Sequence, residues 1–124
     1  MKLINQLLVA VQNVAAVEAL ALAGRAGMDL EMVMEIISAS AGDSRTFQTA
    51  AVRLRERDFA DGASVDILDK DSQLVESLAE ELGAAVPMLL VARQMYQTAR
   101  ERGLGAMDMA SLIKLFEGSW VLTG

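Results

Sequence analysis

The chain has 124 residues, about the size of one domain, and its composition is 53% hydrophobic but only 4% aromatic. Its net charge of -6 gives no general basic field for nucleic-acid phosphates, and the lack of cysteine and histidine excludes disulfides, thiolate or imidazole metal sites and Cys or Ser–His catalysis. Any acid or base must therefore be Lys, Asp, Glu or Tyr.

The longest predicted element covers residues 2–26. It has no proline and no glycine until its last turn, Gly27 can stop it, and Leu, Val and Ala recur on nearly every side. This pattern predicts a central helix that other helices bury. Five polar residues interrupt the apolar run: Lys2, Asn5, Gln6, Gln12 and Asn13. The uninterrupted stretches are too short for a bilayer span or a secretory leader, so we expect a cytoplasmic protein.

Two shorter helices are predicted next. Asp29 is a candidate N-cap for an amphipathic helix that ends at about Ser38. Asp43 or Ser44 can cap the following helix, which continues to about Arg55.

Three more helices complete the prediction. The first runs over residues 64–82 and is closed by Gly83, and the second runs over residues 87–102 with proline in its first turn. Asp108 can cap a last helix over residues 109–118. No stretch alternates β-branched or aromatic residues with polar ones as strands do. The fold is therefore predicted to be all-α, a bundle of about six helices around the long first helix.

Three polar residues at the start of the first helix are candidates for chemistry. Lys2, Asn5 and Gln6 share one face, since residues three and four apart are neighbours on a helix. An ammonium group beside two neutral amides suits proton exchange with a polar substrate oxygen. The alternative, which spacing alone favours, is a solvated terminal lysine beside ordinary surface amides.

A second candidate lies in the fourth predicted helix, where Lys70 stands between Asp66, Asp69 and Asp71. An ion pair between Lys70 and Asp66, one turn apart, explains the lysine structurally and is worth about 0.3 to 0.5 kcal/mol. Taken alone, the stretch favours this explanation over a binding role.

The chain carries, in this order, the segments KLINQLLVAVQNVAAVEALALAGRAGMD, AGDSRTF, VDILDKDSQLV, LGAAVPM and SLIKLFEG. Together they resemble the C-terminal domain of the β-hydroxyacid dehydrogenases, which include 3-hydroxyisobutyrate, tartronate semialdehyde, 4-hydroxybutyrate and L-threonate dehydrogenases and are related to 6-phosphogluconate dehydrogenase. AGDSRTF, SVDILDKD and SLIKLFEG are most similar to the L-threonate-like branch. The resemblance implies that residues 1–124 form a single helical substrate and dimerisation domain, with the fold of the 6-phosphogluconate dehydrogenase C-terminal domain. It also implies an oxidoreductase that oxidises a small hydroxy acid with NAD or NADP.

The resemblance also gives individual residues a role. Lys2, Asn5 and Gln6 match the family's Lys-x-x-Asn-Gln segment, whose lysine is the general acid/base. Lys2 would then be catalytic, and Asn5 and Gln6 would bind substrate, with the division between the two amides left open. Lys70 and Asp71 match the family's Lys-Asp-Leu motif and would lie at the nicotinamide end of the cofactor.

The sequence also departs from the family pattern. Ser72 stands where the Lys-Asp-Leu motif has leucine, and Ala63 stands where many members have phenylalanine. The family's N-terminal Rossmann domain and the glycines before the catalytic lysine are not in this sequence. A site assembled between two domains needs both, so we expect the chain to be inactive alone, as an excised domain or a shortened paralogue.

Two functions stay open from the sequence. In the first, the domain works with a small hydroxy acid, NAD or NADP and its own Rossmann domain, as a homodimer or homotetramer. In the second, it is a free-standing all-α oligomerisation or scaffold module in which Lys2 and Lys70 have no catalytic task. Neither function involves nucleic acid or a membrane.

Overall fold

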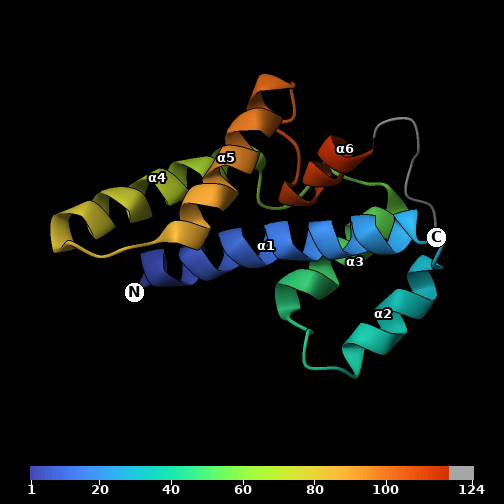
Figure 1. The fold of residues 1–124 in the computed structure, drawn as a ribbon. Coiled ribbons are helices and arrows are strands. Elements are labelled where there is room, and N and C mark those ends of the chain that lie inside the picture. The colour runs from blue at the N-terminus through green and yellow to red at the C-terminus, as the bar shows by residue number, and fades with distance from the viewer. Residues whose placement is uncertain (118–124) are drawn as a thin grey trace.

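A computed structural model describes residues 1–117, and within them the regular elements are helices joined by turns and loops (Figure 1). The elements are α1 (Lys2–Arg25), α2 (Leu30–Ser38), α3 (Arg45–Glu56), α4 (Val65–Leu82), α5 (Pro87–Glu101), the short 3-10 helix η1 (Met109–Leu112) and α6 (Ile113–Phe116). In this part of the chain the only β-type pairing is an isolated bridge between Ser64 and Asp108. The all-α prediction is confirmed.

Helix α1 is the centre of the bundle, as its apolar run predicts. In Figure 1, α4, α5 and α6 lie on one side of α1 and α2 lies on the other, and every other helix contacts it. The expectation that other helices bury α1 on nearly every side is wrong, however, because Ile4 is 60% exposed and Leu22 is 72% exposed. Short neighbouring helices cover only part of the circumference of a 24-residue helix.

The length and composition of α1 also meet the criteria for a membrane span. Such criteria are met equally by the core helix of a soluble domain. Here Val17 and Leu20 of α1 are fully buried within the bundle. We therefore interpret α1 as a core helix.

Three helices end at glycines, as the sequence predicts. Gly27, Gly83 and Gly103 all have positive φ angles, of 79°, 67° and 82°. After α4, the Ala84 N–H donates to the carbonyl oxygen of Ala79 at 2.8 Å, which closes the helix end. Glycine adopts this left-handed conformation without the steric cost that other residues incur.

Helices α2 and α3 differ in how the side chain before each helix caps its N-terminus. The Ser44 hydroxyl accepts a hydrogen bond from the Phe47 N–H at 2.9 Å, whereas Asp29 begins α2 with no side-chain cap bond. We expect Ser44→Ala to lower the free energy of unfolding by about 1 kcal/mol, and Asp29→Ala to lower it by less. Urea unfolding followed by circular dichroism checks this. Equal losses in the two variants would contradict the assigned cap.

The last predicted helix differs from expectation. Residues 109–112 form the 3-10 helix η1, α6 continues only to Phe116, and Gly118 lies outside the described residues. The cause is a pair of loop contacts: the Asp108 N–H donates to the Phe59 carbonyl and the Met109 N–H to the Ala63 carbonyl, each at 2.8 Å. These bonds fix the first turn in a tighter conformation than an α-helix.

Asn13 links α1 to two other elements inside the core. Its Nδ2 donates to the Tyr96 hydroxyl at 3.1 Å and to the Met109 carbonyl at 3.0 Å, and the Tyr96 hydroxyl donates to the Ala10 carbonyl at 2.8 Å. Asn13 and Tyr96 are both fully buried, and burial raises the pKa of the Tyr96 hydroxyl. A buried polar group is tolerated when it is hydrogen-bonded, so this polar interruption of α1 is a helix-to-helix contact.

Asp108 gives the domain a pH-dependent contribution to stability. Its carboxylate is 3% exposed, and burial raises its pKa despite the Ala110 hydrogen bond and the nearby Arg53 charge. Because the folded-state pKa lies above the unfolded value, ionised Asp108 destabilises the fold at neutral pH. This cost disappears as the pH falls through the folded-state pKa to the unfolded value of about 3.9.

The pH dependence can be isolated with Asp108→Asn, which keeps a capping side chain but cannot ionise. We expect the wild type to gain stability relative to this variant between about pH 7 and about pH 4. Urea midpoints of both proteins at the two pH values measure the difference. A difference that stays constant, or that moves the other way, would contradict the assignment.

Candidate functional site

The two sequence segments predicted to carry the site meet in the structure. The Gln6 Nε2 of α1 donates to the Asp71 Oδ2 of α4 at 2.8 Å, across 65 positions of sequence. The Asn5 Nδ2 in turn donates to the Gln6 Oε1 at 3.2 Å. These three residues therefore form one hydrogen-bonded row, which we call the amide row.

The amide row has a defined direction. Asp71 is 8% exposed, Gln6 is half-buried and Asn5 is exposed, so the row runs from the interior to the surface. A carboxylate only accepts, which turns the Gln6 NH₂ inward and its oxygen toward Asn5. Because Gln6 uses only one of the two Asn5 Nδ2 protons, the second Nδ2 proton and the carbonyl oxygen of Asn5 are left for a ligand.

Lys2 and Lys70 lie beside the amide row and are both exposed. Lys2 is the first residue of α1, one turn before Gln6, and Lys70 directly precedes Asp71 in α4. The apolar neighbours of Lys2 in sequence therefore do not shield it from water.

The ion pair predicted between Asp66 and Lys70 is wrong as an explanation of Lys70. The Asp66 Oδ1 instead lies 2.8 Å from the Nε of Arg100 in α5. Helix packing brings a guanidinium, with its planar set of donors, to a carboxylate that sequence spacing alone pairs with the nearer lysine. The pKa of Arg100 is raised, first by its hydrogen bond to Asp69 and then by the charge of Asp66.

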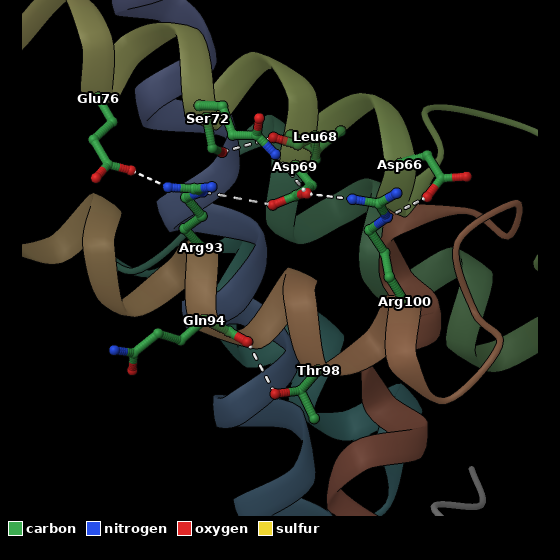
Figure 2. Close-up of polar contacts among 10 residues, drawn as sticks. Asp66, Leu68, Asp69, Ser72, Glu76, Arg93, Gln94, Thr98 and Arg100 are labelled. Carbon is green, nitrogen blue, oxygen red and sulfur yellow. Dashed lines mark hydrogen bonds and ion pairs between the residues drawn. The ribbon is translucent and has the colours of Figure 1, made fainter.

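Asp69, to which sequence reasoning assigned no role in the site, is fully buried and faces α5. The Arg100 Nη1 donates to its Oδ2 at 2.8 Å, and the Arg93 Nε lies 3.8 Å from its Oδ1. Arg93 also forms an ion pair with Glu76, which lies seven residues after Asp69 on α4. Figure 2 shows the resulting α4–α5 ladder, which we define as Asp66, Arg100, Asp69, Arg93 and Glu76.

A sequence signal for this α4–α5 ladder does exist. Asp66, Asp69 and Glu76 are spaced by three and seven positions, so they lie on one stripe of α4. Arg93 and Arg100 are seven apart and share a stripe of α5. Two complementary stripes on consecutive predicted helices indicate an antiparallel charged contact.

The site suits an organic anion better than a metal ion. Within residues 1–117, no group of three or more His, Cys, Asp or Glu side chains is placed to hold a metal. The exposed ammonium groups of Lys2 and Lys70 and the Asn5 amide fit a carboxylate, a hydroxyl and the carboxamide edge of a nicotinamide. No strand, glycine loop and helix of the kind that binds a dinucleotide pyrophosphate occurs in the same residues.

Comparison with known proteins identifies the family of the chain. Residues 1–116 match the family described as "NAD-binding of NADP-dependent 3-hydroxyisobutyrate dehydrogenase". The chain is 35% identical to L-threonate dehydrogenase of Escherichia coli K12 over 117 residues, which are 94% of this chain and 39% of that enzyme. It is 32% identical to 2-(hydroxymethyl)glutarate dehydrogenase of Eubacterium barkeri, with the same shares covered.

A solved structure gives the same answer for the fold. The crystal structure of 3-hydroxyisobutyrate dehydrogenase from Salmonella typhimurium superposes with a TM-score of 0.88 at 35% identity, covering 92% of this chain and 40% of that one. The chain thus spans about two fifths of the length of these relatives. It belongs to the 3-hydroxyisobutyrate dehydrogenase family of NAD(P)-dependent hydroxyacid dehydrogenases.

Proposed function

We propose that this chain is the helical substrate domain of a dehydrogenase that oxidises a small hydroxy acid to its oxo acid with NAD or NADP. The observation that carries the proposal is the amide row, in which Gln6 of the first family segment donates to Asp71 of the second at 2.8 Å. Lys2 and Lys70, which are both exposed and lie next to the row in sequence, act on one ligand in this proposal. The remainder of the site, including the pyrophosphate pocket, comes from a Rossmann domain.

Each residue of the site has a separate task in this reaction. Lys2, as the neutral amine, accepts the proton of the substrate hydroxyl while the carbon–oxygen bond becomes a carbonyl, and NAD or NADP, when bound, would accept the hydride. The second Nδ2 proton of Asn5 is donated to the oxygen of the same hydroxyl, so that the hydroxyl proton is directed toward Lys2. Asp71 holds Gln6, and Gln6 holds Asn5, so the row fixes the position of the substrate amide contact.

Lys70 serves the other side of the bound substrate. It precedes Asp71 on α4 and its exposed ammonium group can pair with the substrate carboxylate or approach the nicotinamide carboxamide. Asp71 is held by Gln6 rather than by Lys70, which leaves Lys70 available for the ligand. The ammonium group of Lys70 then provides positive charge where an anionic substrate has to enter.

Self-association as a homodimer or homotetramer is part of the same proposal. An apolar groove of about 320 Å³ lies between α1 and α5, with Val11 and Val14 on one wall and Met88 and Val91 on the other. Met88 is 66% exposed and Val91 is 60% exposed, an unusual content for a helix that faces only water. Light scattering on the purified protein measures the number of copies.

The experiment that tests the proposed function is an activity screen of the full-length protein that carries this domain. L-threonate, 3-hydroxyisobutyrate and 2-(hydroxymethyl)glutarate, the acids that name the relatives, are assayed with NAD and with NADP by the absorbance of the reduced nicotinamide. We expect turnover of at least one acid, and none from the 124-residue chain alone. An inactive full-length protein that still self-associates would favour the scaffold alternative.

The cytoplasm, which holds these cofactors, is the proposed location.

A further inference from the structure

A contribution to stability does not by itself explain the α4–α5 ladder. Asp69 has no solvent exposure, and its Oδ1 has no hydrogen-bond donor although its Oδ2 is well satisfied. A buried carboxylate paired with arginine is often no more stable than a well-packed apolar residue. The best-attested use of such pairs is to select one packing arrangement among several.

We propose that Asp69, held by Arg93 and Arg100, is a positioning residue that fixes the register of α4 and thereby the placement of Lys70 and Asp71. The proposal rests on the proposed function of those two residues. Asp69 and Asp71 are two positions apart on one helix, so their side chains project to nearly opposite sides. Asp69 faces α5 and Asp71 faces α1, where it accepts from Gln6.

Apolar contacts between α4 and α5 are less selective for register than charged ones, because apolar packing has no direction. Ala79 of α4 and Ala92 and Ala99 of α5 are buried, as are larger side chains such as Leu68, Leu89 and Tyr96. The ladder is selective because its charges alternate between the two helices from Asp66 to Glu76 (Figure 2). A slip of one turn, about 5.4 Å, would take the buried Asp69 carboxylate away from its guanidinium partners.

The same slip would disrupt the site. It would carry Asp71 away from the Gln6 Nε2, which now lies 2.8 Å from its Oδ2, and release the amide row. It would also move Lys70 by a full turn relative to Lys2. A displacement of about 1 Å in a catalytic constellation can lower turnover about a hundredfold, so a register shift of several ångströms is decisive.

The test compares Asp69→Asn with Glu76→Gln in the full-length protein. The second variant removes the distal ion pair with Arg93 but leaves Asp69 bound to Arg100, so it is a matched loss of one ladder charge. Both are studied at a temperature at which circular dichroism shows them folded. We expect kcat/KM to fall about tenfold or more in Asp69→Asn and less than about twofold in Glu76→Gln.

A second readout reports the register directly and does not need activity. The described domain has no cysteine, so spin labels can be placed through Leu22→Cys at the end of α1 and Leu82→Cys at the end of α4, both sites being at least 70% exposed. We expect one distance between the labels in the wild type and in Glu76→Gln. In Asp69→Asn we expect a second distance or a broadened one, since a slip moves Leu82 along the α4 axis.

The outcomes separate this proposal from the proposed function. An unchanged label distance in Asp69→Asn overturns the positioning role, as does a changed distance with kcat/KM like that of Glu76→Gln. If the wild type oxidises no hydroxy acid, the proposed function fails, while the label distance alone still decides whether Asp69 sets the register. A shifted distance together with lost turnover in Asp69→Asn supports both.

Discussion

Replacing Lys2 by alanine in the full-length enzyme is expected to lower kcat by a factor of about 100 to 10,000, the usual contribution of a positioned acid or base. The KM for the hydroxy acid should change little, because in the proposed reaction Lys2 acts on the proton that leaves and not on the carboxylate that anchors the substrate. Lys2 is exposed on the first turn of α1, so the substitution should leave the fold intact. Steady-state kinetics with saturating cofactor measures both constants.

Two further variants distinguish the loss of proton transfer by Lys2 from the loss of a positive charge. Lys2→Arg keeps the positive charge but cannot deprotonate, so it should be as inactive as Lys2→Ala. Lys114→Ala removes another exposed lysine, whose Nζ lies 5.5 Å from the centroid of the Phe59 ring and which takes no part in the proposed site. It should keep the wild-type kcat. Full activity of Lys2→Ala, or activity in Lys2→Arg, would remove Lys2 from the proton transfer.

The largest expected loss of stability comes from Gly62→Ala. Gly62 has a φ of +105°, which L side chains rarely adopt, and a Cβ there would lie 2.3 Å from the Asp108 Oδ1. That carboxylate cannot move freely, because it is buried and its Oδ2 accepts from the Ala110 N–H at 2.8 Å. We expect the free energy of unfolding to fall by about 3 kcal/mol, since backbone strain and a steric overlap are combined. Urea unfolding of the chain measures the loss.

Gly42→Ala is the matched control for this prediction. A Cβ at Gly42 meets no atom within 4 Å, and its φ is not in the left-handed range. The same substitution there should change the free energy of unfolding by less than about 1 kcal/mol and can be stabilising, because alanine restricts the unfolded chain. If Gly62→Ala cost no more than Gly42→Ala, the close approach of the Gly62 loop to Asp108 would be in doubt.

The site was predictable only through whole segments of sequence. Lys2, Asn5 and Gln6 taken alone fitted a solvated helix start better than a binding site, since residue type does not report what lies opposite. The family resemblance supplied Lys70 and Asp71, and the fold then joined Gln6 to Asp71 at 2.8 Å. The catalytic and binding roles of these five residues stay predictions until the kinetics are measured.

The sequence by itself determined the helices and most of their ends. Apolar periodicity and the glycines at 27, 83 and 103 set the boundaries, because these are effects of nearby residues on one another. Only the tertiary structure decided the partners of charged and polar side chains: Asp66 pairs with Arg100 instead of Lys70, and Asn13 bonds inside the core. Local rules act over one turn of helix, whereas a carboxylate or an amide is satisfied by whichever donor the packing of distant helices brings to it.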